Sequence, residues 1–180
     1  MTPLLAISGS PSARSRTAAL TDHLVQRLSA AGLRTGHVRV RDLPAAELLA
    51  GRTDAPALRQ ALDAVAAAGG VVIATPVYKS AYSGLLKAFL DLLPPAGLAG
   101  KTVLPVMTGG SLAHALAPDY ALRPVLMALG AGHVVRGAFV LDRAIELADG
   151  GGTGLTLSPE AGPRLERAVA DFVAALPAKE

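Results

Sequence analysis

Apolar runs alternate with helical patterns along the whole chain. Continuous apolar runs without alternation are typical of strands buried on both faces of a parallel sheet, and they occur at 3–8 and 71–75. A strand is also predicted at 101–107. Further strands are predicted at 35–40 and 133–140. Between the strands, apolar positions recur at helical spacing over 15–31, 54–68, 84–93, 111–129 and 158–176.

Five strands that alternate with helices predict a parallel sheet covered on both faces. We expect a flavodoxin-like three-layer α/β/α fold with strand order 2-1-3-4-5, built by residues 1–180 as one domain. Pro105 in the fourth strand removes one ladder hydrogen bond, which predicts a bulge or a sheet edge nearby. The Gly-rich stretch 148–158 is expected to be a flexible loop, and a Ser-Pro-Glu cap at Ser158 is expected to start the last helix.

Composition narrows the class of protein. The 180 residues include no cysteine, which excludes disulfides, thiolate nucleophiles and cysteine-based metal sites. Aromatic residues make up 3% and the net charge of +3 is spread along the chain, so we expect small phosphate-bearing ligands and no nucleic acid. No signal peptide or apolar span long enough for a membrane helix is apparent, so a cytoplasmic protein is expected.

The loops that follow the first, third and fourth strands are rich in Gly, Ser, Thr and Pro. They read "SGSPSARSRT" from Ser8, "TPVYKSAYSG" from Thr75 and "TGGS" from Thr108. In the order 2-1-3-4-5 the carboxyl ends of these strands are neighbours, and ligands bind parallel sheets at that edge. The sequence therefore predicts one site made from three loops.

The first loop has the character of an anion site. It lacks the spacings GxGxxG and GK[ST], which argues against a dinucleotide cradle and a P-loop. The free N–H groups of a helix N-terminus favour a terminal phosphate monoester, and they are joined here by the side chains of Ser10, Ser12, Arg14, Ser15, Arg16 and Thr17. The alternative is an ordinary helix cap with solvated arginines.

The loop after the third strand has two tyrosines and no carboxylate, a composition that can lay a flat conjugated ring against main-chain N–H groups. Tyr78 and Lys79 could equally form a capped surface turn. These loops hold no pair of acids, no Ser/His/Asp set is apparent, and the four histidines are too scattered to predict a metal cluster. A cofactor that brings its own reactivity needs only positioning and electrostatics, so this kind of site is favoured.

Three segments carry a family resemblance: "GSPSARSRT", "ATPVYKSAYSGLLKAFLDLLP" and "GKTVLPVMTGGSLAHALAPDYALRPVL". They resemble the NADPH-dependent FMN reductases, most of all the branch that supplies reduced flavin to alkanesulfonate monooxygenases. The resemblance runs to about residue 140, and the tail from 141 to 160 departs from the pattern. It implies an oxidoreductase that uses FMN and NADPH, with a flavin-dependent monooxygenase as partner.

The resemblance also implies roles for individual residues. It assigns the flavin phosphate to Ser10, Ser15, Arg16 and Thr17. It assigns one side of the isoalloxazine ring to Pro76, Val77, Tyr78, Lys79 and Ser83, and the other side to Thr108, Gly109, Gly110 and Ser111. His114 either faces the flavin or the nicotinamide or is a satisfied histidine near a helix N-terminus, and Arg14 is left open between phosphate and solvent.

Tyr120 lies between two prolines in "APDYALRPVL". The family branch carries a tyrosine at the matching place that produces a π-bulge at a tetramer interface, so the resemblance implies a homotetramer with Tyr120 at its interface. The alternative is a surface tyrosine on a kinked helix. The surrounding apolar residues favour the interface, because they would otherwise leave a large patch exposed.

Two other functions compete with a reductase that releases its flavin. One is a flavoprotein that retains FMN and reduces quinones, azo compounds or metal oxyanions. The other is a flavodoxin-type electron carrier without enzymatic activity. Such carriers are usually strongly acidic, and the sequence pI of about 9.6 counts against this alternative.

Overall fold

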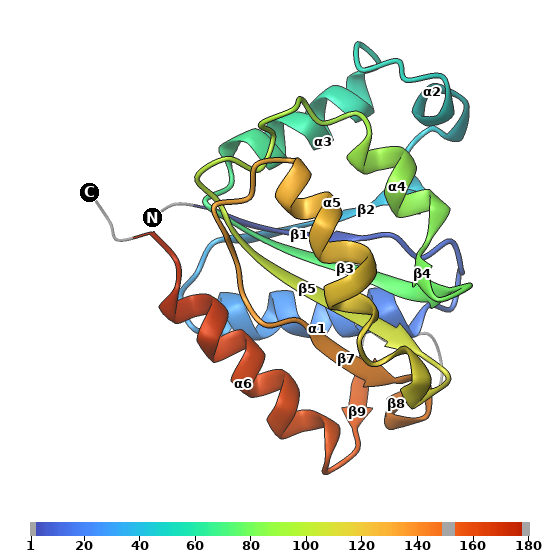
Figure 1. The fold of residues 1–180 in the computed structure, drawn as a ribbon, viewed down its shortest axis with the longest axis vertical. Coiled ribbons are helices and arrows are strands. Elements are labelled where there is room, and N and C mark those ends of the chain that lie inside the picture. Colours follow the sequence, from blue (N-terminus) through green and yellow to red (C-terminus); the bar gives the residue numbers. More distant parts are fainter. Residues whose placement is uncertain (1–2, 149–153, 178–180) are drawn as a thin grey trace.

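A computed structural model describes residues 3–148 and 154–177 of the chain. Its main sheet is parallel and follows the order β2-β1-β3-β5, with β6 and β7 both pairing with β5 at the far edge (Figure 1). The strands are β1 Leu4–Ser8, β2 Thr35–Arg39, β3 Gly70–Tyr78, β4 Ala81–Tyr82, β5 Thr102–Gly109, β6 His133–Val134, β7 Ala138–Leu141, β8 Ile145–Leu147 and β9 Leu155–Leu157. The helices are α1 Arg16–Ala30, α2 Ala45–Leu49, α3 Pro56–Ala67, α4 Gly84–Leu90, α5 Arg123–Ala128 and α6 Ala161–Ala174. The predicted flavodoxin-like order is confirmed.

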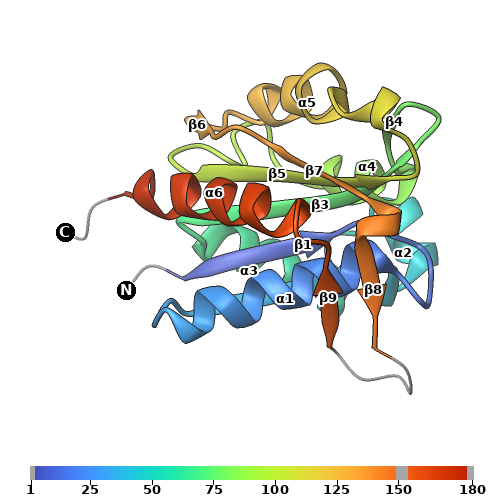
Figure 2. The same ribbon diagram turned by 90° about the horizontal axis from the view of Figure 1, so that it is seen from below.

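Helices cover both faces of the sheet, and the apolar strands divide their side chains between two cores. Leu4 and Ala6 of β1 pack on one face with α1 and α6, whereas Leu5 and Ile7 pack on the other face with α3, α4 and α5. Figure 1 shows α3, α4 and α5 above the sheet and α1 and α6 below it, and Figure 2 looks onto the face that α1 and α6 cover. Side chains on successive strand residues point to opposite faces, so a strand between two helical layers is apolar throughout.

Pro105 interrupts the edge of the sheet. The predicted strand 133–140 is divided into β6, which pairs with Thr102 and Val103, and β7, which pairs from Val106 onward. The break lies opposite Pro105, which has no N–H to donate. The predicted irregularity is therefore confirmed as two short strands in place of one.

The predicted helix 111–129 is wrong as a continuous element. A 3-10 turn covers Leu112–His114, a π-helix covers Pro118–Leu122, and only Arg123–Ala128 is regular α-helix. Pro118 and Pro124 each lack an amide hydrogen, so a regular i to i−4 ladder cannot continue through them. The π-helix itself agrees with the expected bulge at Tyr120.

The C-terminal part differs from the prediction in two places. Within the stretch 148–158, residues 149–153 lie outside the described part of the chain, but Leu155–Leu157 form β9, which pairs with β8 as an antiparallel ribbon. Helix α6 starts at Ala161 after Glu160, which makes no side-chain cap, so the expected cap at Ser158 is wrong. Ser158 instead donates its main-chain N–H to the Ala144 carbonyl at 3.0 Å.

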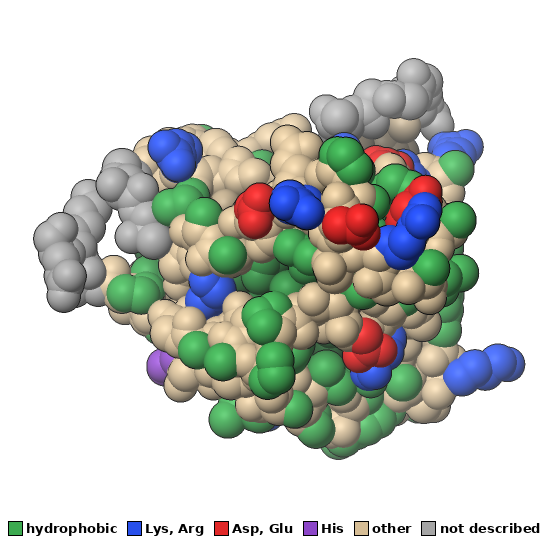
Figure 3. Space-filling model, turned by 90° about the horizontal axis from the view of Figure 1, so that it is seen from above, with side chains coloured by type: hydrophobic (Ala, Val, Ile, Leu, Met, Phe, Trp, Pro, Cys, Tyr) green, Lys and Arg blue, Asp and Glu red, His purple; other side chains and the backbone are tan. Residues whose placement is uncertain are grey.

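Across the described residues, no helix is long and apolar enough to cross a bilayer. On the face shown in Figure 3, acidic and basic side chains are interspersed among apolar ones, with no block of one sign. This distribution agrees with the small net charge of +3.

Candidate functional site

Three contacts join the loops that leave β1, β3 and β5. The Thr17 and Thr108 hydroxyls are 2.7 Å apart, which ties the start of α1 to the end of β5. The Ser83 hydroxyl donates to the Gly9 carbonyl, which ties the third loop to the first. A Cβ placed on Gly109 would lie 3.4 Å from the Val77 Cβ, so the loop after β5 also touches the loop after β3. The three loops therefore form one locus at the carboxyl ends of adjacent strands.

The first loop presents a set of unpaired amides. Ser15 is the N-cap of α1 and accepts from the Ala18 amide at 3.0 Å, as its predicted position implies. Inside residues 3–148 and 154–177, no protein atom accepts a hydrogen bond from the main-chain N–H groups of Ser10, Ala13, Arg14, Ser15, Arg16 and Thr17. A helix N-terminus that keeps several free N–H groups is an anion-binding arrangement.

Arg41, which sequence reasoning missed, orients this loop. It follows β2 and donates through one guanidinium nitrogen to the carbonyls of Ser12 and Ala13, the latter at 2.8 Å. The carbonyl of a trans peptide and its N–H point in opposite directions. With these carbonyls turned to Arg41, the N–H groups of Ala13 and Arg14 point away from it and are available to an anion.

The predicted phosphate residues differ in what their side chains already contact. Ser10 and Thr17 are buried, and the Thr17 hydroxyl is shared with Thr108. Arg16 is exposed and donates its Nε to the Ile145 carbonyl at 3.2 Å, at the start of β8. The contact joins the first loop to β8.

The loop after β3 is a tight hairpin with unusual backbone. Val77 pairs with Tyr82 and Tyr78 with Ala81, which leaves Lys79 and Ser80 as a two-residue turn. Both have positive φ, at 49° and 65°, a conformation that costs non-glycine residues free energy and that clusters at functional sites. Tyr78 is 47% exposed and lies beside this turn.

The hairpin is held by two side chains. The Tyr120 hydroxyl, from the π-helix, donates to the Ser80 carbonyl at 2.8 Å. Ser83 is buried as the N-cap of α4, where its hydroxyl accepts from the Leu86 amide at 3.0 Å while donating to Gly9. Ser83 therefore clamps two loops together, and its hydroxyl proton is already donated to Gly9.

The loop after β5 is partly buried and partly open. Thr108 and Gly109 are buried, and a Cβ on Gly109 would meet the Phe139 ring at 3.2 Å. Gly110 and Ser111 are exposed, and the Ser111 hydroxyl accepts from the Ala113 amide at 3.2 Å. His114 ends the short 3-10 turn after this loop and is half-buried.

One expectation about this region is wrong. No Ser/His/Asp set was apparent in the sequence, yet His37 hydrogen-bonds both Ser8 and Asp22, at 2.8 Å each. These residues come from β2, β1 and α1, so no local spacing reveals them. Among the described residues, no group of three or more histidine and acidic side chains could hold a metal ion.

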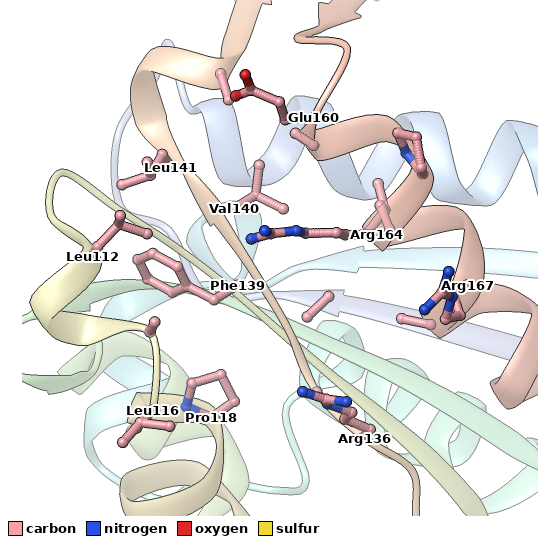
Figure 4. A pocket seen from close by; sticks show the side chains of 18 of the residues that line it. Leu112, Leu116, Pro118, Arg136, Phe139, Val140, Leu141, Glu160, Arg164 and Arg167 are labelled. Carbon is pink, nitrogen blue, oxygen red and sulfur yellow. The ribbon is translucent and has the colours of Figure 1, made fainter.

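A groove of about 660 Å³ lies elsewhere. It runs along the edge strand β7 between the π-helix and α6, and the Arg164 side chain extends across it toward Phe139 (Figure 4). None of the sequence-predicted site residues lines it. Ligands bind parallel sheets beyond the carboxyl ends of strands, so we place the candidate site at the three loops and not in this groove.

Comparison with known proteins identifies similar sequences. A family model described as NADPH-dependent FMN reductase matches residues 2–146. The chain is 47% identical over 147 residues to an FMN reductase (NADPH) of Pseudomonas putida, covering 82% of this chain and 75% of that protein. It is 42% identical over 142 residues to an FMN reductase (NADPH) of Escherichia coli, covering 79% and 74%.

Solved structures agree with the fold. An NADH:FMN oxidoreductase in its apo form is 39% identical, with a TM-score of 0.89 over 99% of this chain and 92% of that one. A Bacillus cereus flavodoxin, at 18% identity, has a TM-score of 0.66 over 97% of this chain and 99% of that one, which shows a shared fold only.

Proposed function

The chain belongs to the NADPH-dependent FMN reductase family and is an oxidoreductase of that class, and we propose that the reduced flavin it makes passes to a partner monooxygenase. Two similar relatives at 47% and 42% identity are named for NADPH, which supports NADPH as the hydride donor. We also propose that the protein works in the cytoplasm.

One observation carries the flavin assignment. In the loop after β1, six main-chain N–H groups between Ser10 and Thr17 have no hydrogen-bond acceptor among the described residues. Arg41 holds the carbonyls of Ser12 and Ala13 on the opposite side. Free N–H groups at a helix N-terminus suit the phosphate of FMN. This arrangement supports the phosphate roles of Ser10, Ser15, Arg16 and Thr17.

The other two loops support a position for the flavin ring. One side of the proposed ring site is the end of β3 with the turn that follows, which holds Pro76, Val77, Tyr78 and Lys79. The other side is the end of β5 with the loop that follows, which holds Thr108, Gly109, Gly110 and Ser111. FMN, when bound, supplies the chemistry itself by accepting hydride at N5. The task of these residues is to orient the two rings, and main-chain donors here would stabilise negative charge at the N1/O2 edge.

Oligomerisation is part of the proposal. Leu112, Leu116, Tyr120 and Met127 are each more than half exposed along the segment that contains the π-helix. An apolar strip of this kind on a protein surface marks an interaction site. We propose that it joins copies of this chain in a tetramer, so the mass in solution should be four times 18.2 kDa as measured by light scattering.

The first prediction concerns turnover. NADPH oxidation by the purified protein is expected to require added FMN and to saturate with it, because reduced flavin leaves for a partner. Initial rates at varied FMN and NADPH test this, with NADH as the comparison donor. Ping-pong kinetics with flavin retained through gel filtration would favour the reductase of quinones, azo compounds or metal oxyanions, and no NADPH oxidation at all would favour an electron carrier.

The second prediction concerns Arg16. Replacing Arg16 by Ala should weaken FMN binding by about 1.5–3 kcal/mol, roughly tenfold to 150-fold in Kd, because a charge-assisted phosphate contact is lost. Quenching of flavin fluorescence measures the Kd. Arg34→Ala is the matched control, since Arg34 precedes β2 at the other end of the sheet. Equal affinities in the two variants would contradict the phosphate role of Arg16.

A further inference from the structure

Four polar side chains from β1, β2 and α1 form a continuous hydrogen-bonded series next to the first loop. The Ser8 hydroxyl lies 2.8 Å from His37 Nε2, and His37 Nδ1 lies 2.8 Å from an Asp22 carboxylate oxygen. Arg39 then donates to both Asp22 oxygens, at 2.6 and 2.8 Å. We call Ser8, His37 and Asp22 the relay, and Arg39 its outer partner.

The order of groups is that of a serine hydrolase, but the surroundings are not. Ser8 is 2% exposed, and it does not line the groove along β7. A hydrolytic serine must be reached by its substrate and must face donors for an oxyanion. The relay therefore has no substrate to attack, and its role lies in the conformation of the protein.

The proton positions follow from the charges. Burial would raise the pKa of Asp22, but hydrogen bonds from Arg39 and His37 outweigh it and leave that pKa below its ordinary value. Burial lowers the pKa of His37, more than the contact with Asp22 raises it. At neutral pH the carboxylate can only accept, so neutral His37 donates from Nδ1 and its Nε2 accepts the Ser8 hydroxyl proton.

The charged groups that face the His37 ring come from three elements. Asp22 lies on α1, Arg39 on β2 itself, and Asp42 in the 3-10 turn that follows β2. From β1 the contact is the uncharged Ser8. No other charged group within the described part of the chain has a resolved influence on His37.

The relay holds both ends of the first loop. Ser8 is the last residue of β1, where the chain enters the loop, and Asp22 lies on α1, the helix that follows the loop. His37 connects the two. From the same strand, the chain continues to Arg41, which holds the loop carbonyls of Ser12 and Ala13.

Protonation of His37 breaks this pattern. Both ring nitrogens then donate, so the Ser8 oxygen must accept from Nε2 and its own proton must turn away. Ser8 is buried, so its hydroxyl cannot replace the lost acceptor with bulk water. The strand end that leads into the loop is then destabilised.

We propose that Ser8, His37 and Asp22 are positioning residues that hold the first loop in its anion-binding conformation, and that protonation of His37 releases the loop and weakens FMN binding in acid. This inference rests on the proposed function, because the anion it concerns is the FMN phosphate.

The test compares pH profiles of FMN binding by flavin fluorescence between about pH 7.5 and 5.5. The phosphate of FMN takes up a proton near pH 6, so the wild-type profile alone is not diagnostic. We expect Kd to rise severalfold more in the wild type than in His37→Gln, whose side chain does not titrate. His23→Gln is the matched control. Burial also lowers the pKa of His23 on α1, but His23 is not part of the relay, so this variant should keep the wild-type profile.

A second variant separates positioning from folding. Ser8→Ala keeps the titrating histidine but disconnects it from the strand, so it should flatten the binding profile as His37→Gln does. Its free energy of unfolding should still decrease as the pH is lowered, as in the wild type. Unfolding lets His37 regain its ordinary pKa near 6.5, so the unfolded chain binds more protons below that pH and acid destabilises the fold. His37→Gln should lose this part of the pH dependence in urea titrations.

The outcomes are distinct. Identical binding profiles in the wild type, Ser8→Ala and His37→Gln would overturn the relay while leaving FMN binding intact. Absence of FMN binding by the wild type at neutral pH would instead contradict the proposed function. A flattened profile in both relay variants, with His23→Gln unchanged, supports the inference.

Discussion

Replacing Gly9 by Ala should destabilise the protein by about 2–3 kcal/mol and weaken FMN binding at least about tenfold. The new Cβ would overlap the Leu86 Cβ and lie 3.0 Å from the Leu86 Cα. Neither atom is the flexible end of a side chain, so β1 and α4 must separate. That movement pulls the Gly9 carbonyl from Ser83 and the Gly9 amide from the Ala74 carbonyl, now 2.9 Å away.

Urea denaturation measures the change in stability, and flavin fluorescence measures the change in affinity. Gly84→Ala is the matched control, because Gly84 starts α4 and no atom lies within 4 Å of the methyl group that alanine would add. Alanine is a better helix former than glycine, so this variant should be unchanged or slightly more stable. If Gly9→Ala matched Gly84→Ala in both measurements, the contact between the first and third loops would not be needed for the site.

The sheet was predictable because each strand carries its own signal. A strand with helices on both faces is largely apolar, and 3–8, 71–75 and 103–107 show this without reference to the rest of the chain. The strand order then places three loops at one edge, and the contacts between Thr17 and Thr108 and between Ser83 and Gly9 confirm that they meet. The roles of individual residues toward the flavin stay predictions.

The relay and Arg41 could not be read from local pattern. His37 meets Ser8 across 29 positions and Asp22 across 15, and these contacts depend on the register of β1 with β2 and on how α1 packs beside them. Turn rules also fail at the hairpin, since a two-residue turn with positive φ favours Asn-Gly and the chain has Lys79-Ser80. Glycine in the stretch 148–158 suggested a loop, although Leu155–Leu157 pair with β8.

The π-helix depends on close packing as well as on its prolines. Gly137 passes between Pro118, the first residue of the π-helix, and Pro105 of β5. A Cβ on Gly137 would lie 2.8 Å from the Pro118 Cβ and 3.1 Å from the Pro105 Cγ. Proline rings cannot rotate away, so a methyl group here must displace the π-helix from the sheet.

We therefore expect Gly137→Ala to destabilise the protein by about 2–3 kcal/mol and to reduce its mass in solution. Displacing Pro118 moves Tyr120, whose hydroxyl donates to the Ser80 carbonyl at 2.8 Å, and with it the exposed apolar strip proposed as the interface. Urea denaturation and light scattering measure the two effects. Gly132→Ala is the control, because the nearest atom to its added methyl is 3.9 Å away. A Gly137→Ala protein with the stability and mass of Gly132→Ala would show that packing at Pro118 does not set the position of the π-helix.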